Sequence, residues 1–560
     1  MRTFSAVHRL LTFLMWLPIW LLAPPAHAQN WQWARGGSQM GGRASAVDVR
    51  NGSTVVAGYF EGSLTLPPFA PLTGPGLYVA RFTSAGVCTQ LVQAPGDAVF
   101  PSDLAIDAQG NITITGNFTL SVTFGAATLT RSLGSKDGFV ARLSAAGAWT
   151  QAAQFGSGYN TEPTSLAVDA AGTATVVGHF DGPALALGAF TLPNADPTGT
   201  TTDLFVARLN PTGVWSQAQS IGGTQYERAF GVTLDAQGTA TVVGSYESPR
   251  VNFGTKQVVN TSLAYRSEGF VASMLPTGRW TRALAIGSAG VDRADAVTLD
   301  RQGRLVVAGV YQYSINLSSL PTLYNSNAPY EEIFVAHLDT ATNTWVQATR
   351  LSGDNEDKVV GLAVDNQNTV LVAGFTRSKW LYGGTALLTN FNQFNNNADV
   401  FVAGLSAAGT WQYILQAGGG GDDLPAGMAA DAQGRCAVVG GFGSSTLAAG
   451  AQALANASAD PVLHAAPFVL RTDATVTAAQ AAAVESAFSL APNPASQQVR
   501  LTFGRGPHAP GVQLLDGLGR EVRRWDVGAA ATQAVLPLVG LAPGVYLLRS
   551  GRATARLLVE

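Results

Sequence analysis

The sequence of 560 residues predicts an all-β chain in which one unit of four strands is repeated seven times. Three short motifs return in a fixed order along the chain, and internal repetition of this kind is typical of architectures built from stacked units. The composition agrees, because 63 glycines and 9% aromatic residues accompany few segments with a helical pattern.

The first motif is a turn, Asp-x-x-Gly, between two apolar runs, as in LAIDAQGNITITGNF at 104–118. A tight turn needs a residue with positive φ, which Gly adopts best and Asn next best, and the sixth copy has Asn368 in place of Gly. The Asp is suited to accept backbone N–H groups of the turn, whereas a calcium loop needs several oxygen ligands. We therefore interpret the motif as scaffold rather than a metal site.

The turn Asp recurs every 59 to 66 residues, at Asp48, Asp107, Asp169, Asp235, Asp300, Asp365 and Asp431, and the first copy has one extra residue before Gly52. A Gly ends each following run, at Gly58, Gly116, Gly178, Gly244, Gly309, Gly374 and Gly440.

The second motif is a strand of the type FVARL, and the third is a strand that begins with an aromatic residue. The FVARL-type strands are expected at 77–82, 138–143, 204–209, 269–274, 333–338, 400–405 and 467–472. The aromatic residues are Trp149, Trp215, Trp280, Trp345 and Trp411, with Cys88 in one copy and Trp31 and Trp33 near the start. The long variable connections, such as 245–268, are expected to add a hairpin to each unit.

The ends of the repeat region predict that the units close into a ring. The chain starts on a Trp strand at 31–34 with no FVARL-type strand before it, and the repeats stop on PFVLRT at 467–472 with no Trp strand after it. One unit is then completed from both ends, which replaces two open sheet edges by a paired ladder. The pattern resembles the seven-bladed β-propeller repeats that are common in secreted bacterial proteins, and it covers residues 31–472. The resemblance implies a propeller domain at 29–472 and leaves the function open.

The first 28 residues have the pattern of a secretory signal peptide. Arg2, His8 and Arg9 precede a short apolar run, and Ala26-His27-Ala28 matches a cleavage site. An uncleaved anchor is the alternative, although the run is short for a membrane span. No transmembrane segment is expected in the mature chain. With 12% charged residues and a net charge of −3, no nucleic-acid partner is expected either.

The C-terminal region predicts a separate small domain. Residues 473–487 are Ala-rich and are expected to be a linker or a short helix, and residues 488–560 alternate short strands with turn sequences, as in a small β-sandwich. This region resembles the type A C-terminal sorting domain of the type IX (Por) secretion system of Bacteroidota. The matching positions are Pro492, Asn493, Pro494, Ala495, Asp516 to Gly519, Gly544, Val545, Tyr546 and Arg556, where Lys is more usual.

The resemblance to the sorting domain implies a route and a set of partners. The protein would cross the inner membrane by its signal peptide and leave the periplasm through the type IX secretion machinery. The sorting domain would then be removed, and the protein would be released or attached to surface lipopolysaccharide.

Acidic residues recur in the connections that precede the inner strands, and they are the candidate ligand-binding residues. If these connections meet at one end of a central channel, their carboxylates form a ring that could bind a cation such as Ca²⁺ or a basic ligand. The alternative is a set of solvated acids that accept backbone N–H groups. The candidates are Asp97, Glu162, Glu227, Asp292, Asp357 and Asp423, with Glu356 and Asp422 beside the last two.

Other chemistry-bearing residues give weaker signals. His179, His337, His464 and His508 fall in unrelated positions, and no motif pairs one of them with a nucleophile. Cys88 and Cys436 are expected to be small buried fillers, and no metal-ligand spacing is present. The segment 379–397 combines aromatic and amide side chains, as at glycan or protein contacts, or is a long mobile loop.

The sequence therefore predicts a secreted or cell-surface binding module without a cofactor, Ca²⁺ being the alternative. Its ligand would be an extracellular glycan or protein. The rival hypothesis is an extracellular polysaccharide lyase or hydrolase that uses carboxylates at the mouth of the channel.

Overall fold

The computed structural model describes most of the chain and divides it into two compact units. One unit is Gln29–Ala474, and the other includes Thr475–Glu560. The described residues are 30–36, 42–50, 52–132, 134–262, 266–288, 290–325, 327–384, 386–390, 396–456, 465–473, 488–491, 495–503, 511–515, 521–528, 531–542, 544–550 and 553–559. The expected signal peptide and all of the expected linker but Asp473 lie outside them, as do Pro492, Asn493 and Pro494.

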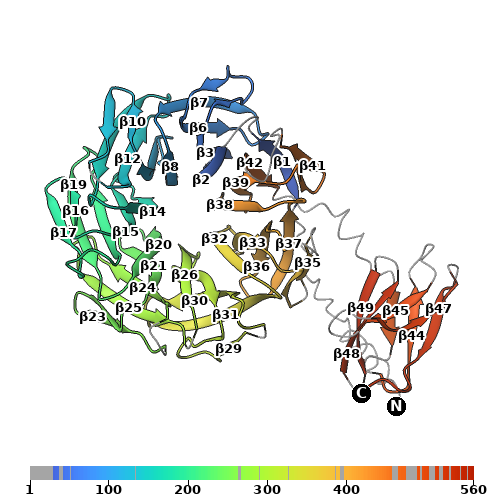
Figure 1. The fold of residues 1–560 in the computed structure, drawn as a ribbon. Helices are drawn as coiled ribbons and strands as arrows, with labels where there is room; N and C mark the ends of the chain where they lie inside the picture. Colours follow the sequence, from blue (N-terminus) through green and yellow to red (C-terminus); the bar gives the residue numbers. More distant parts are fainter. Residues whose placement is uncertain are drawn as a thin grey trace, which may run out of the picture. The chain divides into compact units, whose positions relative to one another are not determined.

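In the larger unit, the described residues form seven antiparallel sheets of one plan, arranged around a central channel (Figure 1). Each sheet has an inner, a second, a third and an outer strand, in that spatial order. The inner strands are β2 (Gly42–Arg50), β8 (Val99–Ile106), β14 (Thr161–Val168), β20 (Glu227–Leu234), β26 (Arg293–Leu299), β32 (Asp357–Val364) and β38 (Asp423–Ala430). The second strands are β3 (Ser53–Phe60), β9 (Ile112–Phe118), β15 (Ala174–Phe180), β21 (Ala240–Tyr246), β27 (Leu305–Tyr311), β33 (Val370–Thr376) and β39 (Cys436–Phe442).

The remaining two strands of each sheet carry the FVARL and Trp motifs. The third strands are β6 (Gly76–Phe82), β12 (Asp137–Leu143), β18 (Asp203–Leu209), β24 (Glu268–Met274), β30 (Glu332–Asp339), β36 (Asp399–Leu405) and β42 (Ala466–Thr472). The outer strands are β7 (Cys88–Pro95), β13 (Trp149–Phe155), β19 (Trp215–Ile221), β25 (Trp280–Ile286), β31 (Thr344–Gly353), β37 (Trp411–Ala417) and β1 (Trp31–Gly36). The repeated four-stranded sheets confirm the expected propeller architecture.

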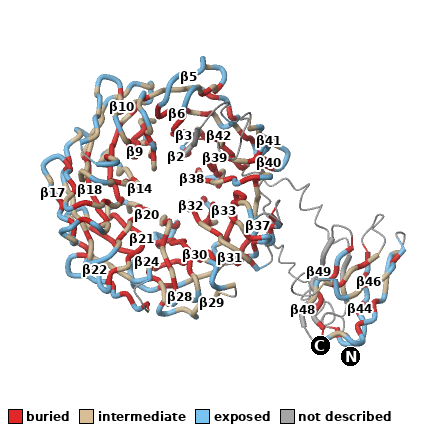
Figure 2. The backbone as a smooth tube through the Cα atoms, viewed as in Figure 1, coloured by how far each residue is buried: buried red, intermediate tan, exposed pale blue. Residues whose placement is uncertain are grey.

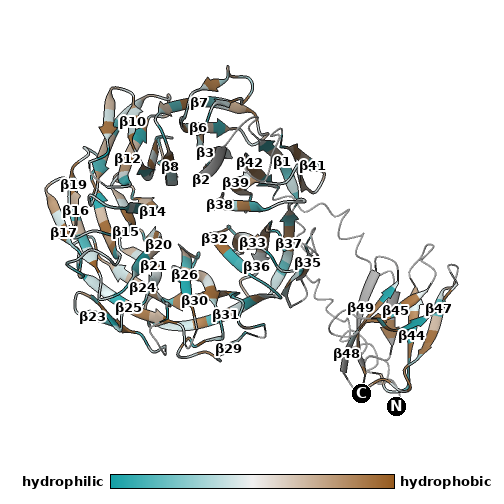
Figure 3. Cartoon of the chain, in the orientation of Figure 1, coloured by the Kyte–Doolittle hydropathy of each residue, from teal (hydrophilic) through white to brown (hydrophobic). Residues whose placement is uncertain are grey.

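Hydropathy explains which strands form the core. The second and third strands are rich in Val, Ile, Phe and Ala and are buried on both faces, whereas the inner and outer strands alternate with partly exposed residues (Figures 2 and 3). Strands covered on both faces read as continuous apolar runs, because neither face meets water. The core therefore lies between neighbouring blades.

The repeated turn is a scaffold element, as predicted. Asp107 Oδ1 accepts the N–H groups of Gln109 at 2.9 Å and Asn111 at 2.8 Å, and five later turn acids, from Asp169 to Asp431, repeat this pattern. Gly110 has a φ of 86°, and Asn368 has a φ of 63° at the equivalent position. The first copy needs a correction, because Asp48 lies within β2 and accepts the N–H of Ile106 in the next blade.

The two ends of the repeat region pair as expected. Strand β1 is antiparallel to β42, with Ala34 opposite Leu470, so the last sheet has the order β1-β42-β39-β38. Trp31 takes the anchor position of this blade, and its indole donates to the carbonyl of Gln416 in the blade before. The closing strand is thus held by backbone and side-chain bonds.

Each blade carries an additional two-stranded hairpin between its second and third strands, as expected. The hairpins are β4 (Ser63–Leu64) with β5 (Leu72–Thr73), β10 (Ser121–Phe124) with β11 (Ala127–Thr130), β16 (Ala184–Leu187) with β17 (Phe190–Pro193), β22 (Arg250–Phe253) with β23 (Lys256–Val259), β28 (Ser314–Ile315) with β29 (Leu323–Tyr324), β34 (Trp380–Gly383) with β35 (Ala386–Thr389), and β40 (Thr446–Ala449) with β41 (Gln452–Ala455).

The smaller unit has two antiparallel sheets on one apolar core. One sheet has the order β43-β44-β47, from Phe488–Ala491, Gln498–Phe503 and Gln533–Pro537. The other has the order β46-β45-β48-β49, from Glu521–Trp525, Val512–Leu515, Gly544–Ser550 and Ala553–Val559. Leu501 of one sheet and Leu514 and Leu548 of the other belong to the same buried cluster.

Candidate functional site

The inner strands share an irregularity that shapes the channel. Each has a register shift at the same position, for example between Pro101 and Asp103 in β8, so that one residue has no partner in the ladder. A β-bulge of this kind re-aims a side chain, and six of these residues line the channel. They are Ser102, Thr164, Phe230, Asp295, Val360 and Ala426.

The repeated Gly of the second strand makes room for the bulge. Gly244 lies opposite Ala229, where the bulge of β20 begins, and a Cβ on Gly244 would collide with the carbonyl oxygen of Arg228. The equivalent glycines of five other blades, Gly116, Gly178, Gly309, Gly374 and Gly440, face the same collision. The repeated Gly has no evident chemical role in the sequence, but it indicates where the channel-facing residues lie.

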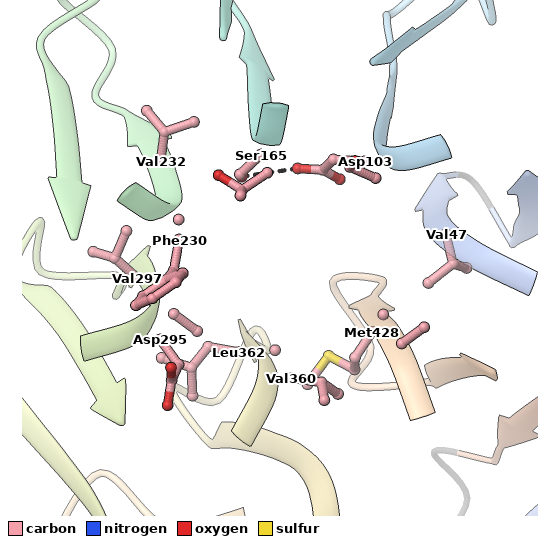
Figure 4. Close-up of a pocket in the computed structure, with 17 residues that line it drawn as sticks. Val47, Asp103, Ser165, Phe230, Val232, Asp295, Val297, Val360, Leu362 and Met428 are labelled. Carbon is pink, nitrogen blue, oxygen red and sulfur yellow. Dashed lines mark hydrogen bonds between the residues drawn. The ribbon is translucent and has the colours of Figure 1, made fainter. Parts of the chain in front are cut away.

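The channel holds a cavity of about 330 Å³ that all seven inner strands line (Figure 4). Its wall alternates apolar groups, such as Phe230 and Met428, with hydroxyls and two carboxylates, those of Asp103 and Asp295. The residue type at the bulge differs from blade to blade, so the ring of side chains around the cavity is asymmetric although the backbone repeats. An asymmetric wall of apolar and polar groups can orient a ligand.

Asp103 joins two blades at the channel wall. Its Oδ2 accepts the hydroxyl of Ser165 and the N–H of Leu166, both at 2.8 Å, and its Oδ1 accepts the N–H of Leu104. Burial raises the pKa of Asp103 to about 6 against the effect of these bonds. Thr164 continues the chain of contacts, because its hydroxyl donates to the carbonyl of Ala229 in the next blade at 2.8 Å.

Asp295 is the second carboxylate of the channel. Its Oδ1 accepts the Nε–H of Arg293 at 2.6 Å, while Oδ2 is buried without a hydrogen-bond partner. Burial raises the pKa of Asp295 to about 6, and the neighbouring guanidinium opposes this rise. This carboxylate therefore has an acceptor atom that is not used by the fold.

Four of the six predicted ring acids are scaffold residues inside the blades, which corrects the expectation of an open ring. Glu227, Asp292, Asp357 and Asp423 stand at or just before the start of their inner strands and are fully buried. Each binds the end of the second strand or the connection that follows it. Ser248 N–H donates to Glu227, Gln312 N–H to Asp292, the Thr376 and Ser378 hydroxyls to Asp357, and the Ser444 hydroxyl to Asp423.

Burial raises the pKa of these four carboxyls, to about 7 for Glu227, Asp292 and Asp423 and to about 8 for Asp357. The other two predicted acids, Asp97 and Glu162, have different surroundings. Asp97 is exposed before β8, and Glu162 pairs with Lys136 at 2.8 Å and His179 at 3.5 Å, which holds its pKa down at about 2. Among the described residues, no three His, Cys, Asp or Glu side chains come together in a way that could hold a metal ion.

A second set of buried acids was not predicted from the sequence. Asp137, Asp203, Glu268, Glu332 and Asp399 open the third strands of five blades and are buried. Tyr246 and Tyr311 donate their hydroxyls to Glu268 and Glu332. The signal was an acid two positions before the Phe of each FVA motif.

The remaining candidates are a histidine and two cysteines inside the blades and the sorting-motif residues of the smaller unit. His337 is fully buried at 3.6 Å from Asp300 of the turn in its own blade, and burial lowers its pKa. Cys88 and Cys436 are free and buried, as expected, and burial raises the pKa of both thiols. In the smaller unit, Gly544 opens β48, Arg556 lies opposite Leu547 in β49, and the Tyr546 hydroxyl donates to the carbonyl of Ala542.

The repeated blades around a channel define the larger unit as a β-propeller. Solved structures that are similar to the chain include Sqt1 from Chaetomium thermophilum, with 10% identity, 79% of this chain and 98% of that chain covered, and a TM-score of 0.36. A chain of the mitotic checkpoint complex has 8% identity, coverages of 74% and 89% and a TM-score of 0.36. YCF48 bound to D1 peptide has 12% identity, coverages of 70% and 98% and a TM-score of 0.32. At these scores the likenesses carry no inference about function.

The C-terminal unit has a more specific counterpart. Residues 489–557 match the family model described as "Secretion system C-terminal sorting domain", Por_Secre_tail. This domain implies export through the type IX secretion system and indicates secretion or attachment to the outer surface. A comparison with curated proteins gave no match. Within the described part of the chain, no helix has the length and apolar character needed to cross a membrane.

Proposed function

We propose that the protein is an extracellular or cell-surface binding module whose ligand occupies the central channel of the propeller. The observation that carries this proposal is the cavity of about 330 Å³ lined by the bulge residues of the inner strands. The backbone of the bulge is the same in each blade, whereas the side chain at the bulge differs. This arrangement is expected where a surface is adapted to a ligand.

The chemistry of the wall favours binding of a small polar group. Phe230, Val360 and Met428 offer apolar contact, Ser102 offers a hydroxyl, and Asp295 offers an acceptor. A ligand that carries a hydrogen-bond donor beside an apolar face, such as a sugar residue or a peptide side chain, matches this set.

The rival proposal, a polysaccharide lyase or hydrolase, would use the carboxylates of the channel. Asp103 and Asp295 are the two candidates in the wall, and both have a raised pKa. Asp103, however, uses Oδ2 to hold the strands of two blades together, and its Oδ1 accepts the N–H of Leu104 in its own strand. This engagement favours a structural role for Asp103 and leaves Asp295 without a partner carboxylate for acid–base work.

The test is to probe a glycan and polypeptide array with the chain from Gln29 to Glu560 and with its Phe230→Trp variant, which narrows the cavity. We expect a ligand whose affinity falls at least about tenfold in the variant because the channel is filled. Val214→Ala, at an exposed position of an outer turn, is the matched control and should bind like the unchanged protein.

Binding that is equal in the unchanged protein and Phe230→Trp would move the ligand away from the channel. Release of shortened oligosaccharides from a bound polysaccharide, abolished by Asp295→Asn, would replace the binding module by the enzyme. A protein that binds nothing on the array would also overturn the proposal.

A further inference from the structure

The hairpin β34–β35 of the sixth blade presents an aromatic face to solvent. Trp380, Tyr382 and Leu387 are 37%, 44% and 58% exposed, whereas the alternating residues Leu381 and Leu388 are buried below. Tyr382 lies directly opposite Leu387, and Trp380 lies opposite the exposed Thr389. Because alternate residues of a strand share one face, Trp380 and Tyr382 stand side by side, about 7 Å apart along the strand.

Among the hairpins with four-residue strands, and within the described residues, this face is the one that carries exposed aromatic side chains. Of the propeller's eight tryptophans, all within the described residues, the seven other than Trp380 are buried or partly buried at blade anchors. The hairpin β10–β11 has the same length and pairing, and it carries Ser121, Thr123, Thr128 and Thr130 at the four equivalent positions. Three further hairpins of that length, β16–β17, β22–β23 and β40–β41, carry no aromatic residue there. An exposed Trp and Tyr contribute nothing to the fold that Ser and Thr do not supply in the second blade.

The hairpin is also the most firmly attached of its kind. β34 pairs with the outer strand β31 of the fifth blade, with Ser352 opposite Tyr382, and the sheet of that blade thereby extends to six strands. The hairpins of several other blades make a single bridge there, for example Gly156 with Ala186. In Figure 1, β35 lies at the outer rim beside β37. The aromatic rings therefore stand on a rigid base, away from the channel.

The charge of the face distinguishes between possible occupants. Trp380, Tyr382, Leu387 and Thr389 include no ionisable carboxylate or cation, so an ionic ligand has no partner within the face. A pyranose ring has C–H groups on its faces and hydroxyls at its rim, which suit a flat aromatic ring and a neighbouring hydroxyl. The backbone of β34 is paired on both sides, to β31 and to β35, so the strand that carries Trp380 and Tyr382 offers no edge to an incoming peptide strand, whereas β35 is the last strand of this sheet.

We propose that Trp380, Tyr382 and Leu387 form a platform that binds an uncharged polysaccharide chain, separate from the channel. The platform rests on the proposed function in one respect, since the protein must meet this ligand outside the cell. Trp380 and Tyr382 stack on sugar rings of the same chain, and Leu387 and Thr389 border them. The site is an open surface, so it recognises the interior of a long chain rather than its end.

The test is affinity electrophoresis of the chain from Gln29 to Glu560 in gels that contain soluble galactomannan, xyloglucan, mixed-linkage β-glucan or dextran. The variant Trp380→Ser/Tyr382→Thr gives the sixth blade the residues that the second blade carries. We expect at least one of the four polymers to retard the unchanged protein and the variant to lose about tenfold or more in affinity. Ser121→Ala/Thr123→Ala is the matched control and should be retarded like the unchanged protein, as should the channel variant Phe230→Trp.

The outcomes separate this proposal from the proposed channel site. Equal retardation of the unchanged protein and Trp380→Ser/Tyr382→Thr overturns the platform, and retardation lost in Phe230→Trp instead assigns the polymer to the channel. Retardation by none of the four neutral polymers also overturns it. So does a dimer in size-exclusion chromatography that the double variant converts to a monomer, because the occupant is then a second copy of the chain.

Discussion

In four blades, the two ends of the inner strand carry acids whose hydrogen bonds differ in sequence range. The turn acids, such as Asp107 and Asp235, accept N–H groups two and four residues later in the sequence. The entry acids Glu227, Asp292, Asp357 and Asp423 stand at the other end, and they bind groups about twenty residues later, across a complete strand and a connection. The hydrogen bonds of a turn acid form within the turn motif itself. The hydrogen bonds of an entry acid form only when the strands of the whole blade pair in the correct register.

The largest expected effect concerns the most distant contact, the closing strand. Trp31→Ala/Trp33→Ala removes two buried side chains from β1, and we expect a loss of at least about 3 kcal/mol in the free energy of unfolding, because Trp→Ala substitutions in a core cost about 3–5 kcal/mol each. Urea denaturation followed by circular dichroism measures it. The exposed Trp380→Ala should lose less than about 0.5 kcal/mol, and equal losses would contradict the role of β1 as the closing strand.

The next effect concerns a buried ion pair beside the closure. Arg471 is fully buried, bonds to Thr54 of the first blade and donates to Asp431 at 3.1 Å. Arg471→Met should cost about 3 kcal/mol, because it leaves a buried carboxylate short of its partner. Arg435→Met removes the partly exposed partner of the same carboxylate and should cost less. If the two variants melt at the same temperature, the buried Arg471 contributes no more to stability than the partly exposed Arg435.

The entry acids predict a pH dependence of stability. Their pKa values in the folded protein, about 7 to 8, lie above those of an unfolded chain, near 4, so the unfolded chain ionises first as the pH rises. The free energy of unfolding should then fall by at least about 2 kcal/mol between about pH 4 and pH 8, because a shift of one pKa unit is worth about 1.4 kcal/mol for each group.

Thermal melts at constant ionic strength measure this slope. Asp357→Asn/Asp423→Asn should flatten it, since two of the buried ionisable groups are gone, and Asp97→Asn at an exposed position should leave it unchanged. Stability that rises over the same range would show that the entry acids fold in their charged form.

A smaller effect is expected at the turn acids. Asp107→Ala leaves the N–H groups of Gln109 and Asn111 without their acceptor and should cost about 1 kcal/mol, because each net hydrogen bond contributes about 0.5–1.5 kcal/mol and the turn remains open to water. Asp107→Asn keeps an acceptor oxygen and should recover most of the loss. A cost above that of Arg471→Met would reverse the ranking of local and distant contacts.

The smallest effect is expected at Asn368. Its positive φ suits Gly, but its side chain accepts the N–H of Arg301 at 2.8 Å and donates to Gln302 at 2.9 Å in the preceding blade. Asn368→Gly should therefore destabilise the protein by less than about 1 kcal/mol, because relief of the backbone offsets part of the two lost bonds. A more stable variant would show that the bonds between the blades contribute nothing.

Features that depend on short motifs and on their order along the chain could be predicted from the sequence. The turn, the Asn368 exchange, the additional hairpins and the pairing of β1 with β42 follow from local motifs and their order, and the structure confirms them. The candidate site was less predictable. The bulges depend on the register between two strands, and the burial of Glu227 and Asp292 depends on how their side chains meet a connection about twenty residues away. An acid before a strand looks the same in sequence whether it faces solvent or the interior.

The pairing of β1 with β42 also determines when the propeller can close during synthesis of the chain. Synthesis makes β1 at the beginning of the propeller and its partner at the very end, so the first strand waits for nearly the whole domain before it can be paired. The ring is therefore completed only when the sorting domain is the next segment to follow. A chain that ends anywhere before β42 leaves β1 without its partner strand.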